Sequence, residues 1–130
     1  MSMEADRSPI ERDRPRIATS ADFLRAAHDT RISTHTRVKC AFECIYLCLC
    51  EIAESRGLQL NGLEHPNEKV IQAGLSAMDV SEAEQSVVEE LARWTADSSP
   101  FLPASSLGDA CYLAERINAR AISVLTLPRS

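Results

Sequence analysis

The chain has 130 residues, of which 45% are hydrophobic and 25% are charged, values that exclude wholesale disorder and fit one globular domain. Its net charge of -5 gives it no overall attraction to phosphate backbones, so broad electrostatic binding of nucleic acid is not expected. With only 4 Gly and 6 Pro, the chain lacks the turn residues of a many-stranded β-sandwich or barrel. A compact helical domain remains.

Residues 1–18 are predicted to form a flexible tail in front of a single folded domain, residues 19–127. The tail is polar, carries charges of both signs, and is interrupted by Pro9 and Pro15. It also lacks the apolar stretch of a secretory signal peptide. We therefore expect a cytoplasmic protein whose fold begins near Thr19.

The most apolar run of the chain, residues 40–53, is not expected to enter a membrane. It is too short to span a bilayer, and it contains Glu43 and Glu51. Four of the five cysteines lie between Cys40 and Cys50. Because the number of cysteines is odd and no secretory signal is visible, we interpret them as reduced thiols in the cytosol.

Two helices are predicted in the first half of the domain. The first covers residues 19–28, because Thr19 and Ser20 can cap it and apolar side chains follow on one side. The second covers residues 33–56 and ends at Gly57, the residue type that most often follows a helix.

The second predicted helix is apolar around most of its circumference. Its middle is longer than an ordinary strand, which favours a helix for this continuous apolar run. At about 100° per residue, its one polar side holds Lys39, Glu43, Leu47, Glu51 and Glu54. The pattern predicts a central helix that its neighbours cover on nearly every other side.

Three further helices follow. The third is predicted to begin at residues 65–67 with a proline in its first turn, and the fourth opens with a capping box over residues 81–84. The fifth is capped by Ser105 or Ser106. No segment alternates at period two for long enough to predict a strand. The predicted fold is therefore all-α, an antiparallel bundle of four or five helices with a flexible N-terminal tail.

The cysteines of the second helix form one stripe. Cys40, Cys44 and Cys48 are spaced i, i+4, i+8, and Cys111 of the last helix is a fourth possible soft ligand for a metal. A straight helix separates successive ligands by about 6 Å along its axis, however, and free cysteine is among the most buried residue types. We interpret the stripe as small core residues and predict no metal and no cofactor.

The three histidines, His28, His35 and His65, lie on separate segments without the spacing of a metal site. We interpret them as surface or capping residues. The sequence contains no nucleophile elbow and no Gly-rich phosphate loop.

The candidate binding residues are Lys39, Glu43, His65 and Arg93. Lys39, Glu43 and Glu51 lie on the polar stripe of an otherwise apolar helix. One interpretation is a solvated face. The other is a groove against Arg93 of the fourth helix, closed by a Glu–Arg contact. His65, at the start of the third helix, is the fourth candidate.

Four short patterns follow one another within residues 20–125. They are Arg37-x-x-x-Ala41-Phe42-x-x-Ile45-Tyr46, His65-Pro66-x-x-x-Val70, Leu91-x-Arg93-Trp94 and Asp109-Ala110-Cys111-Tyr112-Leu113-Ala114. In this order they resemble the HEPN family of small helical bundles, especially its compact bacterial branch of uncharacterised proteins.

The resemblance implies one of two functions. Some members of this family are metal-independent ribonucleases, often toxins paired with a nucleotidyltransferase antitoxin, and others are non-catalytic modules that bind RNA or nucleotides or dimerise. Catalytic members carry an Arg, four to six residues and then a His near the end of the penultimate helix, and act across a dimer. Arg93 takes the Arg position here, but Ser98, Ser99 and Pro100 stand where the His is expected.

No Arg-x4-6-His motif occurs anywhere in the chain, so the general acid–base role has no occupant. The first hypothesis is therefore a non-enzymatic interaction or ligand-binding module that forms a homodimer, with a nucleotidyltransferase-type antitoxin as the protein partner that the resemblance implies. RNA and nucleotide ligands stay open. The alternatives are a metal-independent ribonuclease acting across a dimer and an unrelated small regulatory helical protein.

The sequence predicts that Cys40, Cys44 and Cys48 are free thiols without a bound metal ion. Elemental analysis of protein purified without added metal is expected to find no stoichiometric zinc. One zinc ion per chain would contradict the prediction and make the stripe a ligand set.

Overall fold

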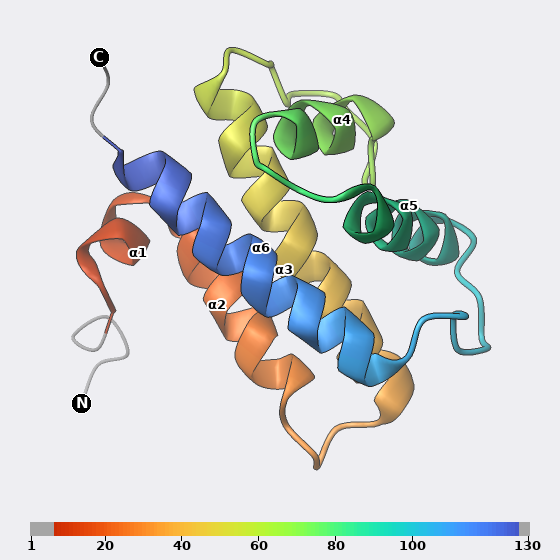
Figure 1. The fold of residues 1–130 in the computed structure, drawn as a ribbon. Coiled ribbons are helices and arrows are strands. Elements are labelled where there is room, and N and C mark those ends of the chain that lie inside the picture. The colour runs from red at the N-terminus through yellow and green to blue at the C-terminus, as the bar shows by residue number, and fades with distance from the viewer. Residues whose placement is uncertain (1–6, 128–130) are drawn as a thin grey trace.

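The computed structural model describes residues 7–127, and these residues form six α-helices and no strand. The helices are α1 (Pro9–Asp13), α2 (Pro15–Ala27), α3 (Thr34–Ser55), α4 (Glu68–Ser76), α5 (Glu82–Ala96) and α6 (Leu107–Thr126). The prediction of an all-helical chain is confirmed. α2 and α6 lie along α3, and α4 and α5 lie across its other flank (Figure 1).

The direction of the last helix differs from a simple antiparallel order. α2 and α3 run in opposite directions, but α6 runs in the same direction as α3 (Figure 1). The two crossing helices α4 and α5, together with the long connection over residues 97–106, return the chain to the end of the molecule at which α3 begins. Consecutive helices are therefore not all packed as antiparallel neighbours.

The fold begins earlier than Thr19, which corrects the predicted tail over residues 1–18. Both prolines of this segment stand at the first position of a helix, where the missing N–H costs nothing, so they start α1 and α2 rather than interrupt a coil. Ile17 is fully buried in the core and anchors the start of α2. Of the predicted tail, residues 1–6 lie outside the part that the structure describes.

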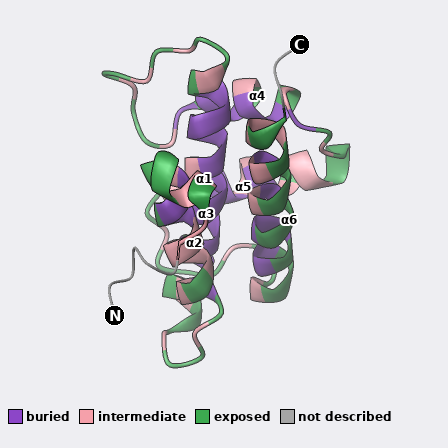
Figure 2. Ribbon diagram, turned by 90° about the vertical axis from the view of Figure 1, so that its left-hand side faces the viewer, coloured by how far each residue is buried: buried purple, intermediate pink, exposed green. Residues whose placement is uncertain are grey.

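The central helix α3 agrees closely with the sequence prediction. The Ser33 side chain accepts a hydrogen bond from the backbone of Thr36 at its start. At its end, Gly57 adopts a φ of 99°, and the Leu58 N–H donates to the Ala53 carbonyl at 3.1 Å. This left-handed C-terminal turn needs a residue without a side chain. α3 is buried along nearly its whole length, whereas the flanking helices are buried only on their inner sides (Figure 2).

The starts of the later helices are set by short polar caps. Asn67 caps α4 and accepts hydrogen bonds from the two following turn amides, so Pro66 precedes the cap instead of lying in the first turn as expected. The capping box of Ser81 and Glu84 opens α5 as predicted. Ser106 caps α6.

A buried polar bridge joins the three main helices. The Asn118 amide of α6 donates to the Ser20 hydroxyl of α2 at 3.0 Å and to the Cys48 sulfur of α3 at 3.7 Å. Ser20 in turn donates to the Ile17 carbonyl at 2.7 Å. These hydrogen bonds hold the three helices in position relative to one another. They also give the buried Ser20 hydroxyl both a donor and an acceptor partner.

The Gly74 contact gives a stability prediction. A methyl group at Gly74 of α4 would lie 2.9 Å from the Leu49 Cα of α3, so the two helices would have to move apart. We expect Gly74→Ala to lower the free energy of unfolding by about 1–3 kcal/mol despite the better helix propensity of alanine. The measurement is chemical denaturation followed by circular dichroism.

Gly108 provides the matched control. A methyl group there would meet no atom closer than the Ser106 hydroxyl at 3.8 Å, and the position lies in the first turn of α6. Gly108→Ala should therefore leave the stability unchanged or raise it by up to about 1 kcal/mol. Equal losses in the two variants would contradict the close approach of α4 to α3.

Candidate functional site

The structure brings two of the four predicted binding residues together. His65, just before α4, lies 2.9 Å from the Glu43 carboxylate of α3 through its Nε2 atom. The edge of the Tyr46 ring packs against His65 with centroids 4.4 Å apart, and the Tyr46 hydroxyl accepts a hydrogen bond from the Asn67 N–H at 2.8 Å. Burial raises the pKa of Tyr46 to about 12, so its hydroxyl is neutral near pH 7.

The other two predicted residues lie apart from this pair. Lys39 is exposed one turn before Glu43 and has no ion pair within residues 7–127. Arg93 lines a groove of about 300 Å³ between α4 and α5, where Pro66, Ile71 and Ala92 supply apolar walls. The expected contact between Glu43 and Arg93 is not among the ion pairs of the described residues, because Glu43 binds His65 and Arg93 faces α4.

Glu51, the second acid of the polar stripe, is buried. Glu51 is only 6% exposed, and its carboxylate lies 3.3 Å from the Arg16 guanidinium and 3.7 Å from the Arg14 guanidinium. Both arginines come from the turn where α1 passes into α2. A carboxylate this deeply buried needs compensating charge, and the N-terminal turn folds back over α3 to supply it.

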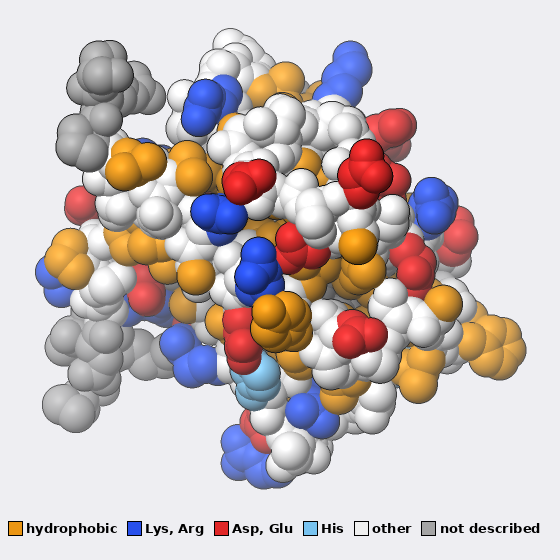
Figure 3. All heavy atoms as spheres, viewed as in Figure 1, with side chains coloured by type: hydrophobic (Ala, Val, Ile, Leu, Met, Phe, Trp, Pro, Cys, Tyr) orange, Lys and Arg blue, Asp and Glu red, His pale blue; other side chains and the backbone are white. Residues whose placement is uncertain are grey.

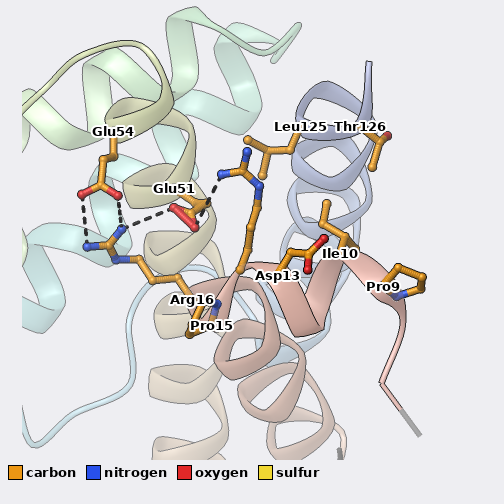
Figure 4. Close-up of a pocket in the computed structure, with 10 residues that line it drawn as sticks. Pro9, Ile10, Asp13, Pro15, Arg16, Glu51, Glu54, Leu125 and Thr126 are labelled. Carbon is orange, nitrogen blue, oxygen red and sulfur yellow. Dashed lines mark hydrogen bonds and ion pairs between the residues drawn. The ribbon is translucent and has the colours of Figure 1, made fainter. Parts of the chain in front are cut away.

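The two arginines lie at the wall of an open cavity of about 960 Å³. Figure 4 shows Glu51 and Glu54 of α3 on one side of it and Leu125 and Thr126 of α6 on the other, with the start of α2 between them. We call this the corner cavity. Its lining residues are Pro9, Ile10, Asp13, Arg14, Pro15, Arg16, Glu51, Glu54, Leu125 and Thr126.

The two guanidinium groups of the corner cavity are engaged to different degrees. Arg16 donates to both oxygens of Glu54, at 2.9 and 3.5 Å, and to Glu51 at 3.3 Å. Its hydrogen bonds with Glu54 raise the pKa of Arg16 further, against the effect of burial. Arg14 has only the longer ion pair to Glu51, and its side chain donates no hydrogen bond to any residue from 7 to 127. Arg14 therefore keeps donors for another acceptor.

The cysteine stripe is part of the core. All five cysteines are buried, unpaired thiols. The hydrogen bond with Cys48, together with burial, raises the pKa of Cys44, and burial raises the pKa values of Cys40 and Cys111. Across residues 7–127, no three His, Cys, Asp or Glu side chains are grouped so that they would hold a metal ion.

Sequence reasoning missed Arg14 and Arg16 because it placed them in a tail. A signal for them was present: Pro15 at a helix start is followed by Ile17, an apolar residue that a solvated tail does not need. Nothing local pointed to Glu51 as their partner, since the ion pair joins residues 35 positions apart.

Comparison with known proteins adds no relative: no family model, no curated protein and no solved structure matches this chain. None of the helices described is long and apolar enough to span a bilayer.

The ion-pair arrangement predicts that Arg16→Gln lowers the free energy of unfolding by about 1–3 kcal/mol, because Glu51 keeps only the more distant Arg14. Adding Glu51→Gln to this variant should restore part of the loss, since the uncompensated buried charge is then removed. Denaturant unfolding of the single and double variants measures both effects.

Arg56 is the control, because it is exposed at the end of α3 and makes no side-chain hydrogen bond or ion pair within residues 7–127. Arg56→Gln should change the stability by less than about 0.5 kcal/mol. A loss as large as that of Arg16→Gln would show that general charge, and not the Glu51 pair, is responsible.

Proposed function

We propose that this chain is a non-enzymatic helical module of HEPN type that binds a ligand or a protein partner and self-associates. The observation that carries the proposal is that each imidazole of the described residues is engaged by a partner other than Arg93. His28 binds Glu115 at 2.6 Å and His35 binds the Ser99 carbonyl at 2.8 Å, while His65 is held by its carboxylate partner on α3. Arg93 instead lines the groove beside α4.

General acid–base catalysis of RNA cleavage needs an imidazole and a cation at the same phosphate. Because each imidazole within one chain is engaged by another group, the arrangement favours binding over chemistry. The face seen in Figure 3 mixes acidic and basic side chains, so it offers no single-signed surface to a phosphate backbone. The corner cavity, in contrast, combines charged and apolar side chains, as ligand sites do.

The connection before α6 supports the self-associating part of the proposal. Phe101 and Leu102 are 76% and 56% exposed, although the loop that carries them is fastened to α5. The Trp94 indole donates to the Phe101 carbonyl at 2.7 Å, and Glu90 accepts from the Ser105 N–H at 2.9 Å. Apolar side chains held outward on a fastened loop are typical of contact residues.

The remaining parts of the proposal rest on the family resemblance. They are a single domain with the bundle architecture of that family, a cytoplasmic bacterial location, and a nucleotidyltransferase-type antitoxin as the protein partner.

One observation favours the ribonuclease alternative. His35 reaches the C-terminal end of α5 from the start of α3, with its ring 5.1 Å from that of Trp94 and its Nε2 on the Ser99 carbonyl. Folding thus brings an imidazole to the segment where the family motif expects its histidine. Because the catalytic members act across a dimer, Arg93 of a second copy would have to complete such a site.

The decisive test incubates the pure protein with mixed single-stranded RNA in the absence of metal. We expect no cleavage by the wild type or by Arg93→Ala, His35→Ala and His65→Ala. Light scattering at the same concentration should give twice the mass of one chain, so that the dimer is the species tested.

Two results would change the proposal. Cleavage that disappears in Arg93→Ala and His35→Ala would replace the binding module by the ribonuclease. A mass of one chain at tens of micromolar protein would remove self-association from the proposed function.

A further inference from the structure

We infer that the corner cavity binds a small aliphatic monocarboxylate, with the carboxylate on the Arg14 guanidinium and the aliphatic body against Ile10 and Leu125. The inference deepens the proposed binding role and rests on it, but it depends neither on the HEPN resemblance nor on self-association. Three properties of the cavity carry it: the state of its arginines, its charge balance and its apolar wall.

Arg14 is the group that would receive the ligand. It lines the cavity, its side chain is about one-third exposed, and its one ion pair, to Glu51, spans 3.7 Å. The neighbouring Arg16 is occupied by Glu51 and Glu54 and is not open to a second acceptor in the same way. A guanidinium with unused donors in a fixed fork matches the two oxygens of a carboxylate.

The backbone of Arg14 is held in place before a ligand arrives. Its backbone N–H donates to the Ile10 carbonyl at 2.9 Å, and its own carbonyl accepts from the Ile17 N–H at 3.0 Å. The start of α2 has no side-chain cap and no acidic residue in its first turn, so its positive end adds to the attraction for an anion. A backbone that is fixed in advance reduces the entropy lost on binding.

Two arginines against three carboxylates leave the lining with a net negative charge, so the charge balance limits how much charge a bound anion can carry. Arg14 and Arg16 neutralise Glu51 and Glu54, and Asp13 adds one negative charge at the same wall. A phosphate dianion would meet this surplus of carboxylates, whereas a single carboxylate bound to Arg14 adds the least like-charge repulsion.

The apolar wall of the corner cavity favours a ligand with an aliphatic chain. Pro9, Ile10 and Leu125 line the cavity there, and Ile10 and Leu125 are only partly buried. A volume of about 960 Å³ leaves ample room for a short chain. Covering these side chains would remove apolar surface from water, which supplies binding free energy that inorganic anions cannot obtain.

The test titrates the full chain with hexanoate, 1-hexanol and inorganic phosphate and follows backbone amide resonances by NMR. Hexanoate should shift the amides of Ile10, Arg16 and Leu125 together, with a dissociation constant in the millimolar range. We expect 1-hexanol and phosphate each to bind about tenfold more weakly or worse, because each lacks one of the two features.

Variants identify the receiving group. Arg14→Gln should weaken hexanoate binding by about tenfold or more, Arg14→Lys should weaken it less, and Arg56→Gln should leave it unchanged. If Arg14→Gln does not fold, Arg14→Lys and the three wild-type titrations still decide the matter. Hexanol or phosphate binding as tightly as hexanoate, shifts confined to other segments, or unchanged affinity in both Arg14 variants would overturn the inference.

The outcome is separable from that of the proposed function. A chain that self-associates, cleaves no RNA and ignores hexanoate retains the proposed role and loses this ligand. A chain that cleaves RNA and also binds hexanoate through Arg14 retains the ligand and loses the non-enzymatic role.

Discussion

The apolar circumference of α3 is the constraint on which the rest of the structure depends. A single neighbour covers only one stripe of a helix, so a helix that is apolar on most sides needs several partners. α2 and α6 cover two sides of α3, and α4 closes a third where Gly74 admits the backbone of Leu49. α5 packs on α3 less extensively, and α1 packs on α2. The order in which the helices are layered follows from this need for cover.

The segments that pack over α3 also bury one of its charged side chains, Glu51. Glu51 lies on the side of α3 over which the turn between α1 and α2 folds, and a carboxylate there is stable only with a cation beside it. Arg14 and Arg16 meet that need from a segment whose composition is that of a solvated tail. Compensation of one buried carboxylate therefore extends the fold toward the N-terminus, and both arginines line the corner cavity.

The other polar groups are distributed over separate places. Glu43 and His65 tie the segment before α4 to α3, Arg93 faces the groove between α4 and α5, and His35 fastens the loop after α5. The contacts of His65 and His35 have a structural effect, since each joins two segments. The residues that the sequence singles out for binding are thus distributed over separate parts of the fold and do not form one site.

Short-range interactions account for what the sequence by itself determined. The all-helical class, the extent of α3 with Gly57 after it, the capping box at Ser81 and the buried cysteine stripe all depend on residues within a few positions of one another. The tertiary structure alone decided that Glu51 is buried under Arg14 and Arg16, that Glu43 binds His65 and not Arg93, and that α6 runs along α3 in the same direction. Helical periodicity shows which side of a helix is polar. The residues that pair with that side come from distant segments, and the local sequence pattern does not show where those segments lie in space.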